Sequence, residues 1–541
     1  MQYGIIAAAL NATAEFVDIP VFEVFSALVN GTVDVLIRGY IHEFSTQVYE
    51  VCILFEYYVC ILDASSVHYC RNVFRSNPFF THSLNPIDIA AFLKPYSQSP
   101  LSFSYPYGHT GLAIAGVPHY VDCFDNNFRH LGNCSDLMLC HSEGNRQLEV
   151  RNRYIPQRNA LRSESHVASL LEFGKGKCNV IMADASILIS EASARGAGYE
   201  GEYKFAKTVF QQAPNVAVLR PDDPKFADFV SFALQSVFAA DLRNLSKSTA
   251  DTFEQTDLFG EHYKNMFRNA IRSVGTFPEL LDLHFGAGRT TVPISAPNDG
   301  STGLLFPYPL GDVEQTREGR PLSARMLSLI EKGRLRCGVV VNRPGFANKT
   351  DDNSMGGFAG MDIDYCRAVA AALFHGGSDS VDFVVLDNIS DGYVQLASGE
   401  IDLLAGATWT LENDVQEPRT GFGFSFSKPY FYGYSEMEDN FCLAVRQDDH
   451  DWDTFVYWVV MATIIAEDRG INLANSTRMP EAFVFGSEYN RMLRDAILAV
   501  GSYEEIYNRN LEGIVARGGR NVLNNDPQNW MPNQYIVPGL T

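Results

Sequence analysis

The chain lacks an excess of basic charge. Its 541 residues include 42 Lys and Arg against 64 Asp and Glu, which gives a formal net charge of -22. Phosphate backbones and anionic membrane surfaces are bound by basic stripes, and this composition does not favour them. We therefore expect no nucleic-acid partner.

Long apolar runs are missing too. The longest, 51–62 and 455–466, fall short of the roughly 18 apolar residues that indicate a membrane-spanning helix. We therefore expect no direct membrane insertion. The N-terminal stretch 1–12 carries a small apolar run without basic residues before it, which makes it a poor signal peptide.

Motifs of common enzymes and metal sites are not found. The sequence has no Gly-x-Ser-x-Gly elbow, P-loop, His-Glu-x-x-His or glycine-rich dinucleotide loop, and none of its ten cysteines forms a Cys-x-x-Cys pair. Four histidines between 109 and 141 are too loosely spaced to indicate a metal site. We therefore expect no catalysis, no cofactor and no bound metal.

Asparagine sequons, in contrast, are more frequent than chance predicts. Together with the cysteines they favour a secreted, periplasmic or luminal location in which disulfides form. The alternative is a reduced cytosolic protein with buried thiols. The seven sequons begin at Asn11, Asn30, Asn133, Asn244, Asn348, Asn388 and Asn475.

One helix-like stretch occurs twice. The sequence MFRNAIRSVGTFPELLDLHF at 266–285 returns as MLRDAILAVGSYEEIYNRNL at 492–511, at an offset of 226 residues. The same offset aligns the chain from about 215 to 285 with its C-terminal part, and no gap is needed. A repeat of this length indicates a duplicated domain rather than a solenoid.

Two earlier blocks repeat at larger offsets. FSALVNGTVDVLI (25–37) resembles YVQLASGEIDLLA (393–405), and SFSYPY (102–107) resembles SFSKPY (425–430). Because the offset falls from 368 to 226 along the chain, the first copy must hold a segment that the second lacks. That segment is predicted at 117–212.

Short β-branched runs alternate with helical patterns in the second copy. LASGEIDLL, for example, is typical of a helix, a glycine cap and a buried strand. This alternation predicts an α/β fold with mainly parallel sheets. The boundary between the copies is expected near 312–325, after a stretch rich in Gly, Pro and Ser.

Several motifs of the second copy resemble one known family. The combination of RLRCGVVVNRPGFA, GMDIDYCRAV, LASGEIDLL and TWTL resembles the extracellular solute-binding proteins of family 3. These are the type II periplasmic binding proteins of polar amino-acid ABC importers, and the general L-amino-acid-binding branch is the most similar. The resemblance covers most of 320–541, and 1–50 with 100–310 more loosely.

The resemblance implies a fold in which two α/β lobes clamp a ligand. Repeat one would then be 1–312, with lobe one at 1–116 and 213–312 and lobe two at 117–212. Repeat two would be 321–541, mostly lobe one, with the lobe-two core missing. The implied function is non-catalytic binding of a small polar solute, an amino acid, in uptake or sensing, with a membrane permease or receptor as partner.

The resemblance also implies ligand-binding residues in repeat two. Thr408, Trp409 and Thr410 match the family's Thr-x-Thr-x-x-Arg arrangement, whose Arg grips the ligand carboxylate. That Arg position holds Asn413 here. Phe346 matches an aromatic residue that the family places against the ligand, and loop packing is the alternative.

In lobe two, the family holds the carboxylate on a Gly-Thr-Thr-Thr loop. Here Gly144 is kept, while Asn145 and Arg146 replace threonines. Arg146 would supply a positive partner for the carboxylate, or else be a solvated surface residue. Asp184 matches the family's ammonium-binding Asp, and a helix N-cap is its alternative role.

Three cysteine pairs are expected to form disulfides. Cys140 with Cys178 matches a bridge known in the family, and Cys123–Cys134 and Cys337–Cys366 are the other two. Two further functions remain open: a degenerate scaffold or interaction protein that has lost its ligand site, and an enzyme built on the same fold.

Overall fold

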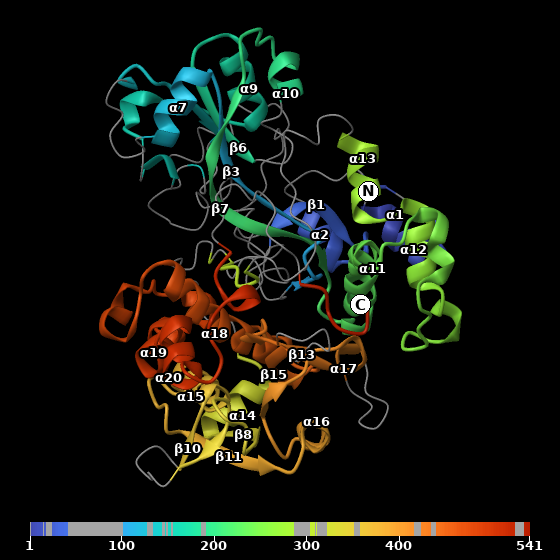
Figure 1. Ribbon diagram of the computed structural model, residues 1–541, viewed down its shortest axis with the longest axis vertical. Helices are drawn as coiled ribbons and strands as arrows, with labels where there is room; N and C mark the ends of the chain where they lie inside the picture. The colour runs from blue at the N-terminus through green and yellow to red at the C-terminus, as the bar shows by residue number, and fades with distance from the viewer. Residues whose placement is uncertain are drawn as a thin grey trace, which may run out of the picture.

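The computed structural model arranges the chain around two sheets joined by a continuous hydrophobic core (Figure 1). Within the described residues, no helix is long and apolar enough to cross a membrane. The residues that the structure describes are 2–14, 16–17, 24–41, 101–126, 134–142, 147, 150–152, 155–184, 191–285, 303–308, 310, 322–350, 357–415, 423–433, 440–524 and 535–540.

The first sheet belongs to repeat one and has seven described strands in the order β1-β7-β3-β6-β4-β5, with β2 also pairing with β7. Two long antiparallel strands, β3 and β7, carry 117–203 away from the rest of the repeat and back (Figure 1). β7 runs unbroken across the predicted lobe boundary at 212. The strands are β1 (Leu36–Ile41), β2 (Ser102–Phe103), β3 (Gly108–Gly116), β4 (Leu139–Ser142), β5 (Ala160–Ser163), β6 (Val180–Asp184) and β7 (Lys204–Leu219).

The second sheet belongs to repeat two and follows the order β11-β8-β12-β15-β13, with β14 also pairing with β15. β11, β8 and β12 are parallel, and helices separate them along the chain, which confirms the predicted α/β class. β9 and β10 form a separate hairpin. These strands are β8 (Leu335–Val340), β9 (Asn348–Lys349), β10 (Phe358–Ala359), β11 (Val381–Leu386), β12 (Leu403–Ala407), β13 (Phe424–Phe426), β14 (Phe431–Tyr432) and β15 (Asn440–Arg446).

The helices of the two repeats recur at the sequence offset of 226. α11, α12 and α13 correspond to α18, α19 and α20 with the same lengths. The described helices are α1 (Gln2–Ala9), α2 (Val24–Val29), α7 (Pro118–Asn126), α9 (His166–Gly174), α10 (Glu191–Gly196), α11 (Pro224–Leu242), α12 (Met266–Val274), α13 (Phe277–Phe285), α14 (Ala324–Lys332), α15 (Met361–Leu373), α16 (Ile389–Ser398), α17 (Leu411–Val415), α18 (His450–Asp468), α19 (Met492–Val500) and α20 (Tyr503–Leu511).

Strand register repeats as well, at the three offsets of the sequence blocks. Leu36 pairs with Val218 in repeat one, and Leu404 pairs with Ala444 in repeat two. Ser102 pairs with Leu219, just as Ser425 pairs with Val445. These segments therefore share one local fold, while duplication of the whole domain stays a prediction.

The motif shared by 266–285 and 492–511 is a turn that needs glycine. Gly275 and Gly501 have φ of 90° and 89°, a conformation that side chains with a Cβ rarely adopt. Glu279 then accepts from the backbone N–H of Thr276, and Glu505 accepts from that of Ser502. Both helix starts thus have their first donors satisfied.

The three expected disulfides all form. Cys140–Cys178 and Cys123–Cys134 tie together the part of repeat one between β3 and β7, and Cys337–Cys366 ties β8 to α15. Each bridge reduces the conformational entropy of the unfolded chain and so stabilises the folded state. Oxidised cysteines are typical of proteins outside the cytosol.

Candidate functional site

The predicted lobe-two residues are described only in part. Asp184 is the last residue of β6, and its backbone pairs with Leu112 of β3. The structure does not describe its side chain. Gly144, Asn145 and Arg146 lie outside the described residues. Their roles in ligand binding stay predictions.

The predicted residues of repeat two follow β12. The Oγ1 of Thr410 accepts a hydrogen bond from the backbone N–H of Asn413 at 3.2 Å. Asn413, at the position of the family's Arg, donates its Nδ2 to the Thr408 carbonyl at 3.0 Å and to the Tyr393 hydroxyl at 3.2 Å. This amide therefore stabilises its own loop and leaves no cationic donor for a carboxylate.

Phe346 packs into an aromatic cluster. Its ring centroid lies 4.9 Å from that of Phe431 and 4.8 Å from that of Phe441, on the hairpin β14–β15. The guanidinium of Arg343 lies over Phe441 at 4.1 Å. In repeat two this hairpin occupies the chain position at which, in repeat one, β3 leads into 117–203.

The two groups of predicted residues lie in different parts of the molecule. Asp184 of β6 and Phe210 of β7 lie at the same level of the sheet, because both pair with Leu112 of the intervening strand β3. Phe103, which lies beside the repeat junction, pairs with Val218 of the same strand. Eight residues of β7 span about 26 Å at 3.3 Å per residue. The structure thus places Asp184 far from Trp409, which lies at that junction.

A cavity of about 170 Å³ opens between the repeats, and we call it the interrepeat cavity. Its walls come from β2 and α11 of repeat one and from β13, α17 and α18 of repeat two. Figure 1 shows α11 directly above α17 and β13. Of the predicted site residues, Trp409 lines it, and its side chain is buried.

The cavity is built from the repeated segments facing one another. Ser102 and Ser425 occupy the same position in SFSYPY and SFSKPY, and both line it. α11 and α18 contribute their first turns, each capped by an aspartate that accepts a backbone N–H. The two copies thus meet face to face around this space.

Two buried carboxyls meet in its wall, Asp228 of α11 and Asp414 of α17. The Oδ2 of Asp414 accepts from the Tyr105 hydroxyl and from the Trp409 Nε1 at 2.6 Å. Gln447 donates its Nε2 to the Oδ2 of Asp228 at 2.8 Å. One hydrogen-bonded network therefore crosses the junction between the repeats.

Burial raises the pKa of both carboxyls. The pKa of Asp414 rises to about 6. The pKa of Asp228 is raised well above its ordinary value by burial, by the charge of Asp414 and by its hydrogen bond with that carboxyl. Like charges in a dry site cannot both ionise easily, so the pair holds one proton at neutral pH.

Lys428 supplies positive charge to the same cavity. Its Nζ lies 5.2 Å from the centroid of the Tyr308 ring. Burial lowers its pKa to about 8. His109 is buried nearby, and burial together with the charge of Lys428 lowers its pKa to about 3, so it is neutral. His450 is held by the Leu101 carbonyl at 2.9 Å and by Asp453.

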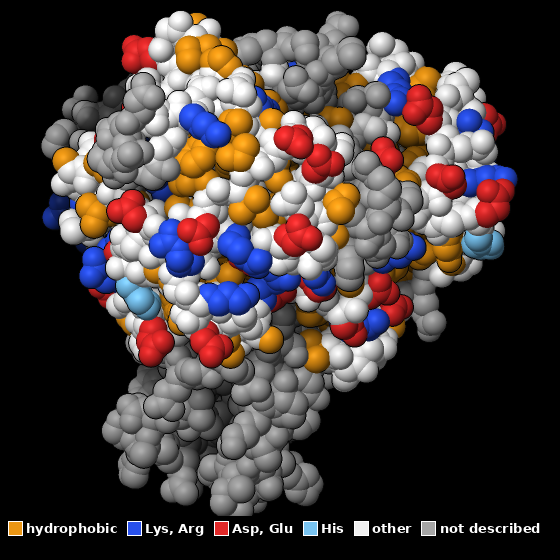
Figure 2. Space-filling view, turned by 90° about the horizontal axis from the view of Figure 1, so that it is seen from below, with side chains coloured by type: hydrophobic (Ala, Val, Ile, Leu, Met, Phe, Trp, Pro, Cys, Tyr) orange, Lys and Arg blue, Asp and Glu red, His pale blue; other side chains and the backbone are white. Residues whose placement is uncertain are grey.

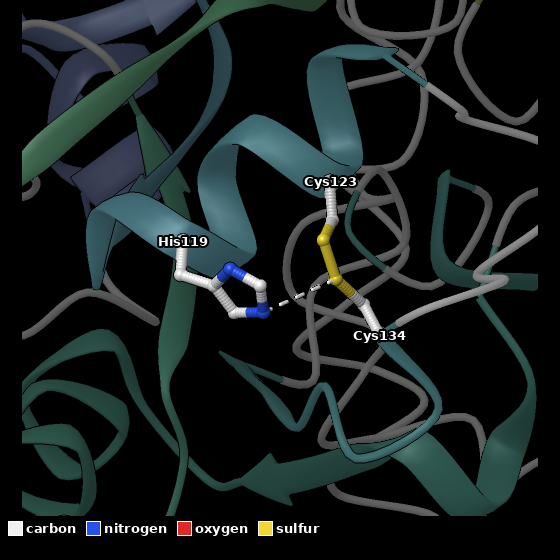
Figure 3. Close-up of side chains that lie close together, drawn as sticks. All are labelled: His119, Cys123 and Cys134. Atoms are coloured by element: carbon white, nitrogen blue, oxygen red, sulfur yellow. Dashed lines mark hydrogen bonds between the residues drawn. A yellow bond between two sulfur atoms is a disulfide. The ribbon is translucent and has the colours of Figure 1, made fainter.

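A separate cluster surrounds the Cys123–Cys134 disulfide. The His119 Nε2 points toward the Cys134 sulfur at 3.9 Å (Figure 3). These three residues have the donor types of a zinc site, but zinc binds thiolates and a disulfide has none. This arrangement packs α7 against the bridge.

The molecular surface seen from below carries both charge signs. Lys and Arg side chains lie among Asp and Glu over the described part of this face (Figure 2). Neither sign forms a continuous field there. Over the part of this face that the structure describes, acidic side chains interrupt the basic ones, unlike the continuous basic stripe that binds a phosphate backbone.

No protein-family model matches the chain. Among curated proteins, it is 38% identical over 112 residues to "General L-amino acid-binding periplasmic protein AapJ" of Rhizobium johnstonii, covering 20% of this chain and 30% of that protein. It is 37% identical over 103 residues to "Putative amino-acid ABC transporter-binding protein YhdW" of Escherichia coli K12, covering 19% and 27%. The expected resemblance to amino-acid-binding proteins of ABC transporters is confirmed over that part of the chain.

The chain thus spans less than a third of the length of these relatives. Among solved structures, it is similar to an "ABC transporter / periplasmic binding protein from Brucella ovis with glutathione bound", with 21% identity and a TM-score of 0.32 over 37% of this chain and 98% of that one. It is also similar to holo ArgBP from T. maritima, with 16% identity and a TM-score of 0.25 over 43% and 76%.

Sequence reasoning missed the charged residues of the interrepeat cavity. Asp414 closely follows the TWTL motif and Asp228 lies in the repeated block 215–285, but neither pattern marked these two residues, and only packing of the repeats brings them together. Tyr105 and Lys428 did leave a trace. They occupy the one position at which SFSYPY and SFSKPY differ, and a difference inside a repeated motif was the available signal.

Proposed function

We propose that this protein binds a small polar solute, an amino acid, without chemically changing it, in solute uptake or sensing. The interrepeat cavity carries the proposal, because it offers charges of both signs and hydrogen-bonding groups between aromatic walls. Binding pockets combine apolar walls with a few placed polar groups in this way. The printed names of the curated relatives support an amino acid as the solute.

We further propose that the protein works outside the cytosol with a permease of an ABC transporter. Three disulfides support the location. The relatives' names, which refer to periplasmic and transporter-binding proteins, support the partner. The exposed sequon residues Asn11, Asn30, Asn244 and Asn388 fit this location as well.

A melting-temperature screen with the twenty L-amino acids and their D-enantiomers tests the proposal. A ligand at 100 times its Kd stabilises the folded state by about 2.7 kcal/mol, so a bound amino acid raises the Tm measurably. We expect some L-amino acids to do so and their D-enantiomers not to. A cooperative melt that no compound shifts would contradict binding.

A second candidate is a scaffold that has lost its ligand site. The inward hydrogen bonds of Asn413, where the family has its carboxylate-binding Arg, favour it. It predicts that Thr410→Ala and Asp184→Ala leave the protein's activity unchanged. Saturable, stereospecific binding of any amino acid in the same screen would exclude it.

A further inference from the structure

The interrepeat cavity holds a cation and an anionic pair that do not neutralise each other. Within the described part of the chain, no carboxylate forms an ion pair with the Lys428 ammonium, whose neighbours include the Tyr308 ring, the Cys442 thiol and the neutral His109. On the other wall, Asp228 and Asp414 hold a proton in place of a counter-cation. Buried charges are normally paired, so this arrangement is incomplete without a ligand.

The carboxyl oxygens are already oriented. Tyr105, Trp409 and Gln447 each donate to one carboxylate oxygen, and these donors come from both repeats. A group that replaced the shared proton would therefore find acceptors in place. An ammonium has three donors and suits such a pair.

The volume of the cavity limits the ligand's size. At about 170 Å³ it is slightly larger than the cavity of about 150 Å³ that holds benzene in an engineered protein. A molecule of about six heavy atoms therefore fits. L-alanine has this size and carries one carboxylate and one ammonium.

We propose that the interrepeat cavity binds a small zwitterion, with its carboxylate at Lys428 and its ammonium at Asp228 and Asp414, whose shared proton it displaces. The inference rests on the proposed function and assigns the binding site to this cavity. The ligand would lie at the junction of the two repeats rather than at the residues expected in lobe two. Both repeats would then contribute charge to one site.

Proton release makes binding depend on pH. While one proton leaves for each ligand bound, affinity rises up to tenfold per pH unit. Above about pH 8 Lys428 loses its charge, and affinity for the carboxylate falls. We expect the tightest binding near pH 8. The other titratable groups that face the carboxyls or line the cavity are Tyr105, Asp223, Cys442, His109, His450, Asp453, Tyr308, Tyr457 and Tyr535.

The test is calorimetry on the full chain with L-alanine, ethylamine and propionate as probes. Ethylamine lacks the carboxylate of L-alanine, and propionate lacks its ammonium. We expect L-alanine to bind at least tenfold more tightly than either analogue. In phosphate and Tris buffers at pH 7, which differ in ionisation enthalpy, the binding enthalpies should report one proton released per ligand.

Charge variants test which residues bind the carboxylate of the ligand and which bind its ammonium. Lys428→Met should weaken L-alanine binding at least tenfold. Asp228→Asn should weaken L-alanine binding and abolish proton release. The asparagine side chain is neutral, as the protonated Asp228 side chain is in the free protein. Lys428→Gln is a second variant should the first not fold. Glu412→Gln removes an exposed carboxylate from the same helix, α17, and should bind like the wild type.

The outcomes separate the two proposals. If neither L-alanine nor any other amino acid binds, the proposed function and this inference both fall. If an amino acid binds without proton release, and both the Asp228 and Lys428 variants bind it like the wild type, only this inference is overturned. Equal binding of L-alanine and propionate would exclude a role for the carboxyl pair.

Discussion

The two repeats use the same backbone pairings and then diverge at one point. In repeat one, β3 and β7 lead out to 117–203 and back, with two disulfides of its own. In repeat two, β14 and β15 form a hairpin at that position. A connection between two neighbouring strands is the kind of place at which a chain accepts a large insertion or deletion. The comparison teaches that the same strand pairings form in both repeats, with 117–203 inserted in repeat one and without such an insertion in repeat two.

The repeats also differ in the residues that they contribute to the interrepeat cavity. At equivalent positions of the cavity wall, repeat one has Tyr105 and Pro224 and repeat two has Lys428 and His450. The backbone pairs alike on both sides, so at these equivalent positions the asymmetry of the cavity comes from the side chains. Matched substitutions in the two repeats can therefore separate what the shared fold needs from what the junction needs.

The largest expected difference concerns the first turns of α11 and α18. Trp452 is fully buried and donates its Nε1 to the Asp402 carbonyl, while its counterpart Phe226 is only partly buried. Trp452→Ala should lower the free energy of unfolding by about 3–5 kcal/mol, because it leaves a cavity in the core. Phe226→Ala should cost about half as much. Urea unfolding measures both, and equal costs would contradict the difference in packing.

The second difference concerns the aspartate that ends the repeated Gly-x-x-Asp turn. Asp402 is buried and accepts from Arg336 at 2.7 Å and 2.9 Å, while Asp34 is 78% exposed and 3.9 Å from Arg220. Asp402→Asn should cost about 2–3 kcal/mol of unfolding free energy, since it breaks charged hydrogen bonds in a buried place. Asp34→Asn, the matched control, should cost at most about 1 kcal/mol. A larger loss at Asp34 would refute this ranking.

The carboxyl pair should make the junction weaker as pH rises. The pKa of Asp414 is raised by burial to about 6 in the folded state, so its stabilising contribution is complete below the ordinary pKa near 4 and is lost as pH rises through 6. Asp228→Asn removes the partner's charge. Its Tm relative to wild type should therefore increase from pH 4 to pH 7, by an amount corresponding to on the order of 2 kcal/mol.

A Tm difference between this variant and the wild type that stayed constant over that pH range would contradict a shared proton. Asp382→Asn is a suitable control, because Asp382 is exposed and pairs with Arg334 at the edge of the second sheet. That variant should show no such trend with pH.

The smallest expected effects concern the turn that both repeats share. Gly275→Ala and Gly501→Ala each place a Cβ at positive φ, against the side chains of Glu279 and Glu505. Both should lower the free energy of unfolding by about 1–2 kcal/mol, and by similar amounts. Thermal unfolding of the two variants measures this. A cost confined to one repeat would show that the shared turn is not equally needed.

Much of the fold could be predicted from local pattern. The helices 389–398 and 503–511 follow from caps and periodicity, and the strand 381–386 from its β-branched run. Register could not be predicted directly. The structure shows it: Leu36 pairs with Val218 and Leu404 pairs with Ala444, and the block offsets of 368 and 226 residues relate the two pairs.

The candidate site was less accessible to sequence reasoning. Motif comparison selected Trp409, which lines the cavity, together with residues such as Phe346 that pack elsewhere. A family pattern marks positions in one complete clamp, while the cavity here lies between two repeated segments of one chain. The pairing of Asp228 with Asp414 depends on α11 packing against α17, and no local signal encodes that contact.

The sequence by itself determined the repeated segments, the α/β class and the resemblance to amino-acid-binding proteins, because each depends on local spacing or on a motif. It also predicted three cysteine pairs, although spacing alone does not fix which cysteines bond, and the structure shows all three. Only the tertiary structure decided which charges meet. Lys428, Asp414 and Asp228 line one cavity, although Asp228 lies 186 residues before Asp414 in the chain. Burial changes the proton affinity of such groups, and burial is a property of the packed chain.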